Sequence, residues 1–135
     1  MAQVIIYTNS NGSVSACFPT GEIAIEEVLS KDCPQGAIIV DDSTFPQGAD
    51  AQFFNAWELN GTTITVNFAK AQEFKLSQYN AFATESAQKR QLNTLANIPN
   101  TIDDATFIAN LASDRAAIAS ATTTEQLIAI SNPQA

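Results

Sequence analysis

The sequence predicts an α+β protein with a β-rich N-terminal part and a helical C-terminal part. Two observations predict this class. Apolar and polar residues alternate on either side of Asn-Gly turns in the first half, which is typical of β-hairpins. Residues 69–97 contain neither glycine nor proline and place apolar residues at helical spacing. We therefore expect a domain boundary near residue 68, with a β-rich head domain (1–67) followed by a helical arm (68–135).

The first three elements of the head follow from short-range signals. Residues 3–18, "QVIIYTNSNGSVSACF", predict a β-hairpin, because a β-branched run and an alternating run flank the turn-forming residues 9–12. Residues 23–36, "IAIEEVLSKDCPQG", predict a short helix that Pro34 and Gly36 end. The segment "AIIVDD" at 37–42 then predicts a short buried strand, followed by a loop.

A second hairpin is expected over residues 54–68, "FNAWELNGTTITVNF". Asn60-Gly61 is a strong signal for a type I′ turn, which needs positive φ at both central positions. Ile64 and Val66 alternate with threonines, so one face of this hairpin is expected to be buried. Trp57, on the partner strand, is expected to cover that face as a core residue and not as an exposed contact.

Three helices are expected after the second hairpin. A long helix of about 25 residues follows residue 68 and ends at Pro99-Asn100. The next begins at Thr101, the expected cap, and the last lies between a capping box, Thr122 to Glu125, and Ile130. The middle helix carries small residues at helical spacing, which permit close helix packing within the chain or between chains. These residues are Ala105, Ala109, Ala112, Ala116 and Ala119.

Composition and charge exclude several classes of partner. The chain has 135 residues, of which 45% are hydrophobic and 15% charged, as in globular proteins. The net charge is −8, and residues 1–60 hold eight acidic residues and one basic residue. A duplex-binding protein or one that binds an anionic membrane surface needs a basic face, so neither nucleic acid nor membrane is expected as a partner. No apolar run approaches the ~20 residues of a membrane span, and no signal peptide is expected.

The residue inventory argues against catalysis. The chain contains no histidine, which removes the usual general base at neutral pH and both Ser-His and Cys-His nucleophile pairs. No phosphate-binding glycine motif is present. Asp41 and Asp42 could form a carboxylate site together with Asp50. The favoured interpretation is that the two residues belong to a solvated turn after a strand. Lys89-Arg90 is expected to be a solvated helix face. No catalytic residue, metal ligand or cofactor is therefore expected.

Cysteines and aromatic residues leave two questions open. Cys17 and Cys33 are expected to be buried free thiols, with a disulfide between them as the alternative. Phe74, Tyr79 and Phe82 of the long helix are the candidate partner-binding residues. The alternative, favoured because this part of the helix directly follows a strand, is that they pack against the β-sheet of their own chain.

Several strings together resemble a family of small proteins of tailed bacteriophages and prophages. These are "VIIYTNSNGSVSACFP", "IEEVLSKDCPQGAIIVDDSTFP" and "FFNAWELNG". Trp57 and Glu58 match the family's A-W-E motif, and the family's K-D-x-P-x-G motif is matched by Lys31, Asp32, Pro34 and Gly36. The resemblance covers residues 4–75. Family tails are often Arg-rich on the long helix, whereas here only Lys89-Arg90 stand there, and Cys33 replaces a more usual aliphatic residue.

The resemblance implies a non-enzymatic virion structural protein. Such a protein would be made in the host bacterial cytoplasm and retained in the virion tail as an accessory of the tail fibre or baseplate. It would bind another virion protein, or a second copy of itself, through its helical half. Two alternatives remain: a tail-fibre assembly chaperone that is absent from the mature particle, and a capsid decoration protein.

Overall fold

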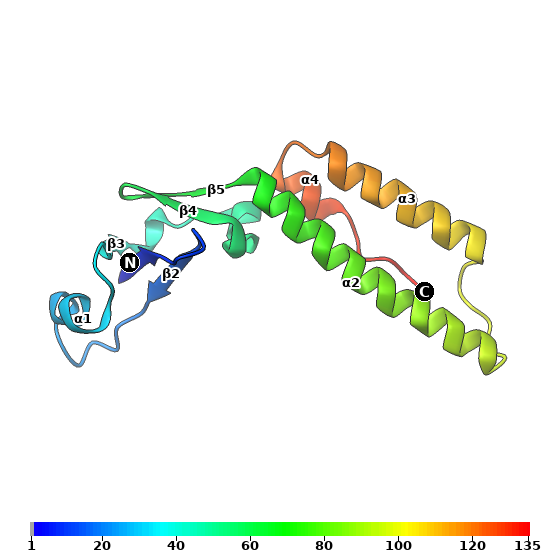
Figure 1. Ribbon diagram of the computed structural model, residues 1–135, viewed down its shortest axis with the longest axis horizontal. Helices are drawn as coiled ribbons and strands as arrows, with labels where there is room; N and C mark the ends of the chain where they lie inside the picture. Colours follow the sequence, from blue (N-terminus) through cyan, green and yellow to red (C-terminus); the bar gives the residue numbers. More distant parts are fainter. Residues whose placement is uncertain (1) are drawn as a thin grey trace. The chain divides into compact units, whose positions relative to one another are not determined.

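The computed structural model describes residues 2–135, which divide into two compact units (Figure 1). Unit 1 extends to Asn67, and unit 2 is Phe68–Ala135. Among the described residues, every strand lies in unit 1 and unit 2 contains only helices and their connections. The α+β prediction is confirmed. The division lies where the sequence changes from alternating to helical periodicity.

Unit 1 contains a three-stranded antiparallel sheet in the order β2-β1-β3. The strands are β1 (Gln3–Thr8), β2 (Val14–Cys17) and β3 (Ile38–Asp41). Ile5 in the central strand lies opposite Cys17 on one side and Ile39 on the other. Because β1 is hydrogen-bonded on both sides, it is the most buried strand of the sheet.

A short helix and three turns complete this part of unit 1. Helix α1 (Ile25–Asp32) lies against β1 and β3 and buries Val28. The expected loop after β3 contains three short 3-10 turns, at Asp42–Thr44, Gly48–Gln52 and Phe54–Ala56.

The second hairpin has a different turn from the predicted one. Its strands are β4 (Trp57–Asn60) and β5 (Thr63–Val66), and Asn60 pairs with Thr63. The two loop residues are therefore Gly61 and Thr62, one position later than expected. Of these two, only Gly61 has a positive φ, of 64°. This pattern fits a type II′ turn, which needs glycine only at its first central position, and the type I′ prediction is wrong.

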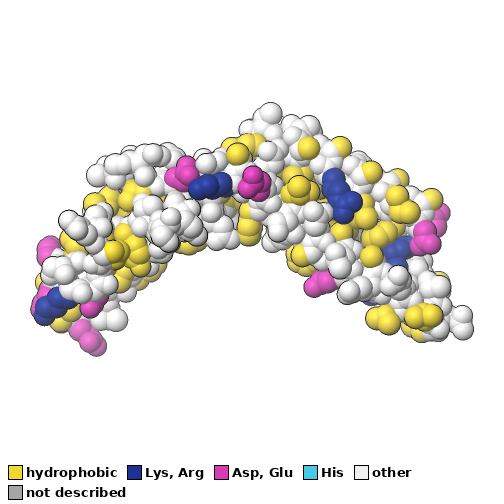
Figure 2. Space-filling model, viewed as in Figure 1, with side chains coloured by type: hydrophobic (Ala, Val, Ile, Leu, Met, Phe, Trp, Pro, Cys, Tyr) yellow, Lys and Arg dark blue, Asp and Glu magenta, His cyan; other side chains and the backbone are white. Residues whose placement is uncertain are grey.

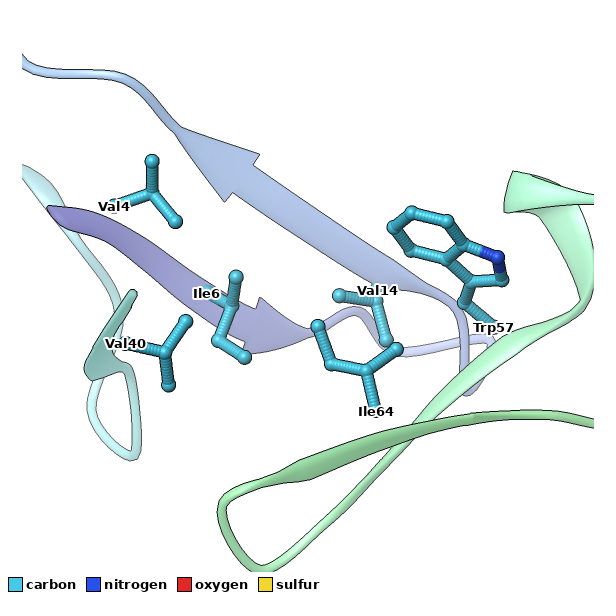
Figure 3. Close-up of a cluster of buried hydrophobic side chains, with 6 residues drawn as sticks. All are labelled: Val4, Ile6, Val14, Val40, Trp57 and Ile64. Carbon is cyan, nitrogen blue, oxygen red and sulfur yellow. The ribbon is translucent and has the colours of Figure 1, made fainter. Parts of the chain in front are cut away.

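The core of unit 1 lies between one face of the three-stranded sheet and the β4–β5 hairpin (Figure 3). The sheet contributes Val4, Ile6, Val14 and Val40, and the hairpin contributes Trp57 and Ile64. The Trp57 ring also packs against Phe45 and Phe54, and its indole N–H donates to the backbone carbonyl of Asp50 at 3.0 Å. The prediction that Trp57 is a core residue is confirmed.

Unit 2 contains three helices, α2 (Phe68–Leu95), α3 (Asp104–Ser120) and α4 (Thr124–Ala129). Helices α2 and α3 lie side by side, and α4 and the C-terminal segment also lie against α2 (Figure 1). The amide of Gln72 donates to the carbonyl oxygens of Ile118 and Ala119 and thereby joins α2 to the last turn of α3.

Helix α2 ends four residues before the proline that was expected to break it. Asn97 adopts the left-handed conformation, with a φ of 58°. The N–H of Ile98 donates to the carbonyl oxygen of Asn93, and the N–H of Asn97 donates to the carbonyl oxygen of Thr94. These bonds form a Schellman motif, so Asn97 ends the helix and Pro99 only follows it.

The caps of α3 and α4 also differ from the expected ones. The carboxylate of Asp103, and not Thr101, accepts a hydrogen bond from the N–H of Thr106. The hydroxyl of Thr123, and not Thr122, accepts from the N–H of Gln126. In both cases a neighbouring side chain competes for the same role, and the geometry of the preceding loop decides between them.

Candidate protein-binding surface

Tyr79, one of the three candidate partner-binding residues, belongs to the core of unit 2. It is only 1% exposed and faces α3, where its hydroxyl donates to Oδ2 of Asp114 at 2.5 Å. Burial, followed by this hydrogen bond, raises the pKa of Tyr79 far above its usual value. Tyr79 is therefore part of the helix packing and offers no surface to a partner.

Lys75 extends this polar cluster to the C-terminal segment. Its ammonium group is buried and donates to the carbonyl of Ile130 at 2.8 Å. Burial lowers the pKa of Lys75, and the nearby charge of Asp114 opposes that shift. One turn beyond Phe82, the hydroxyl of Ser86 donates to the carbonyl of Pro133 at 3.0 Å. The two bonds fasten the C-terminal segment along α2.

The buried cluster predicts an alkaline loss of stability that depends on Tyr79. Above pH ~10, the unfolded chain loses the phenol proton while the folded chain keeps it, so the free energy of unfolding falls as the pH rises. Lys75 acts in the opposite direction: its lowered pKa makes stability rise with pH, up to ~10.4 where the unfolded lysine also deprotonates. In a Tyr79→Phe variant, the free energy of unfolding should no longer decrease at alkaline pH.

This prediction is tested by urea unfolding, followed by helical circular dichroism, at neutral pH and above pH ~10. At neutral pH, Tyr79→Phe is expected to cost about 1.5–3 kcal/mol, because it removes a hydrogen bond to a carboxylate. Tyr7→Phe in unit 1 is the matched control and should retain the alkaline fall. An equal fall in wild type and Tyr79→Phe would contradict the assignment.

Phe74 and Phe82 have different surroundings from Tyr79. Phe82 is 37% exposed, whereas Phe74 is half-buried. The three aromatic residues therefore do not form one continuous stripe. Of the predicted set, Phe82 offers the most apolar surface to a partner. The alternative expectation is wrong for Tyr79, which packs toward α3 and not on the β-sheet.

Arg90 is not the solvated residue that the sequence predicted. It is buried between α2 and α3, with its guanidinium 4.8 Å from the centre of the Phe107 ring. It donates to the carbonyl of Ile102 at 2.8 Å and to the Asp104 carboxylate at 2.5 Å. Because Asp104 is exposed, this ion pair adds little stability. The stacking and the carbonyl bond hold the α2–α3 connection in place.

Beside Arg90, an open groove of about 700 Å³ runs between α2 and α3. Its walls include two exposed apolar side chains, Leu95 on α2 (82% exposed) and Ile108 on α3 (65% exposed). Leu92 and Ile98 are also more than half exposed at this end of unit 2. Hydrophobic side chains are visible there in Figure 2. We call the groove together with these side chains the apolar end of unit 2.

The small-residue seam of α3 faces solvent. Ala105, Ala109, Ala112, Ala116 and Ala119 are all exposed. Helix α3 instead packs toward α2 through Phe107 and Ile118, which are buried. The expectation of close packing along the alanine seam within the chain is therefore wrong.

Asp41, one of the residues considered for a carboxylate site, has a structural role. The Asp41 carboxylate accepts from the N–H of Ser43 at 2.9 Å and caps the following turn, and this backbone hydrogen bond lowers its pKa.

Within residues 2–135, no group of three or more Cys, Asp and Glu side chains is arranged to hold a metal ion. In the same described part of the chain, no helix is both long and apolar enough to cross a membrane.

Sequence reasoning missed the apolar end of unit 2. Leu92 and Leu95 are apolar residues near the end of the long helix, but the buried face of this helix continues through Ala83 and Arg90 instead. The sequence did contain a signal for this: neither leucine lies on the helical stripe that these buried residues form. Comparisons with protein-family models, curated proteins and solved structures gave no match.

Proposed function

We propose that this chain is a non-enzymatic virion structural protein of a tailed bacteriophage, an accessory of the tail fibre or baseplate. It binds another virion protein through the apolar end of unit 2. The observation that carries the proposal is the open groove between α2 and α3, with Leu95 and Ile108 exposed at its edges. The resemblance of residues 4–75 to phage proteins supports the choice of partner.

Exposure of these side chains is unfavourable unless a partner covers them. Burying one leucine or isoleucine contributes about 1.5–3 kcal/mol, and two of them, Leu95 and Ile108, line the open groove. Arg90 and Phe107 form part of the groove lining, and they already stack on each other without a partner. A preformed apolar groove loses less conformational entropy on association than a flexible surface does.

A charge placed in the groove should abolish the interaction. Leu95→Asp or Ile108→Asp would bury a carboxylate in the complex, and we expect at least a ~100-fold loss of affinity for the fibre or baseplate protein. Gln78→Asp, an exposed position on α2 outside the groove, is the matched control and should bind normally. Phe82→Asp tests the interface predicted from the sequence. Normal binding by both groove variants would contradict the docking site.

Particle composition tests the assignment to the tail. The measurement is quantitative mass spectrometry of gradient-purified particles, with copy number scaled to the major capsid and fibre proteins. A copy number tied to the fibre or baseplate is expected. A capsid-scale number would identify a decoration protein, and presence in the lysate without presence in particles would identify an assembly chaperone. Either result would overturn the proposal.

A further inference from the structure

The two cysteines of the chain meet on one face of the three-stranded sheet. Cys17 lies opposite Ile5, the central-strand residue whose neighbours Val4 and Ile6 point into the core beside Trp57. Side chains alternate along a strand, and directly paired residues share a face. Ile5 and Cys17 therefore point to the other face of the sheet.

Helix α1 covers this second face and brings Cys33 to it. The helix lies against β1 and β3, and Val28 and Ile5 are both buried although neither belongs to the Trp57 core. Cys33 directly follows the last residue of α1, and its thiol lies near enough to that of Cys17 for the two groups to interact. Both cysteines are free in this structure, as expected, but they are half-buried, so the expectation that they are buried is wrong.

We propose that Cys17 and Cys33 are a redox-sensitive pair that forms an intramolecular disulfide by exchange with a low-molecular-weight disulfide. A thiolate of the pair attacks one sulfur of the small disulfide, which gives a mixed disulfide and releases one small thiol. The second cysteine then attacks the protein sulfur of this mixed disulfide, and the protein disulfide forms as the second small thiol leaves. Two electrons pass from the cysteine sulfurs to the small disulfide, and the two cysteine protons end on the small thiols.

Chemistry at Cys33 favours a stable disulfide once it has formed. Partial burial, the adjacent Cys17 and the charge of Asp32 raise the pKa of the Cys33 thiol. Strongly oxidising dithiol sites have the opposite property, because a stabilised thiolate favours their reduced form. A raised pKa also makes Cys33 a poor nucleophile at neutral pH, so oxidation should accelerate as the pH rises.

The disulfide would join the end of the edge strand β2 to the residue that follows α1. The segment between the two cysteines consists of residues 18–24, which contain no helix or strand, and α1 itself. Cross-linking the ends of this segment restricts the unfolded chain, which should raise the unfolding temperature of unit 1 by roughly 5–10 °C. The inference does not depend on the proposed function. A chain that passes from a reducing cytoplasm to an oxidising environment would gain this cross-link after folding.

The test uses the full chain in buffers of oxidised and reduced glutathione. Alkylation followed by intact-mass measurement counts the free thiols, a non-reducing gel detects disulfide-linked dimers, and thermal unfolding gives the midpoint. We expect a monomer without free thiols and with a raised midpoint that a reductant reverses. Cys17→Ser and Cys33→Ser variants should instead stop at the mixed disulfide with glutathione, without the raised midpoint.

Three results would overturn the proposal. These are persistent mixed disulfides in the wild-type chain, disulfide-linked dimers as the main oxidised product, and an unfolding midpoint that oxidation lowers or leaves unchanged. Peptide mapping of the oxidised wild-type chain gives the answer even if a serine variant folds poorly. A cross-linked peptide containing both Cys17 and Cys33 supports the proposal, and its absence refutes it.

Discussion

Replacement of Trp57 by alanine is expected to destabilise unit 1 by about 3–5 kcal/mol, because it leaves a cavity in the core and removes the aromatic contacts with Phe45 and Phe54. It also removes the indole bond to the carbonyl of Asp50. A unit of this size is stabilised by only ~3–10 kcal/mol in total, so the variant is expected to lose a large part of the stability of unit 1.

Hydrogen exchange measured by mass spectrometry tests this prediction in the full chain. Peptides from β1 to β5 should lose their amide protection in the Trp57→Ala variant. Phe18→Ala is the control, since Phe18 is largely exposed and touches Phe45 only edge-on. It should cost under about 1 kcal/mol and leave protection unchanged. Retained protection in Trp57→Ala would mean that the unit 1 core does not depend on the indole.

Local signals in the sequence were sufficient for most of the elements of the fold. Turn residues and proline marked the ends of the strands and of α1, and the change of periodicity near residue 68 separated the two units. These signals act within a few residues, so they do not require knowledge of tertiary packing. The errors in the turn after Asn60 and in the caps at Asp103 and Thr123 are shifts of one or two residues between neighbouring side chains that compete for one role.

Local signals could not predict which face of α3 packs against α2. Phe107, Leu111, Asp114 and Ile118 have the same 4-3-4 spacing as the alanines that begin at Ala105, offset by two residues. This offset rotates one stripe about 200° from the other, so both satisfy the same helical period. The larger side chains bury more apolar area, and the stripe that contains Phe107 and Ile118 therefore packs toward α2.

Burial of Arg90 and the meeting of the cysteines also depend on tertiary structure. A lysine-arginine pair on a helix is usually solvated, and only the position of Phe107 on α3 gives Arg90 a ring to stack on. Cys17 and Cys33 come together because the β1–β2 register turns Cys17 toward α1. The packing of α1 against the sheet is a tertiary contact, which local signals do not predict.

In unit 2, replacement of Leu127 by alanine is expected to destabilise α4 and the C-terminal segment strongly. Leu127 is completely buried and is the main apolar anchor of α4, a helix of six residues. The substitution should cost about 2–5 kcal/mol. An isolated helix this short is unstable in water, so α4 is expected to unfold locally when its anchor is removed. The bonds from Lys75 to Ile130 and from Ser86 to Pro133 would then be lost with it.

The measurement that checks this is hydrogen exchange in peptides from α4 and the C-terminal segment. We expect their protection to disappear in Leu127→Ala while the middle of α2 remains protected, because α2 also packs against α3. Ile128→Ala removes the neighbouring, half-buried side chain and should have less than half the effect. Equal losses in the two variants would show that α4 is held by its polar bonds and not by Leu127. In that case Lys75, whose ammonium is buried against the Ile130 carbonyl, would be the residue that fastens the C-terminal segment.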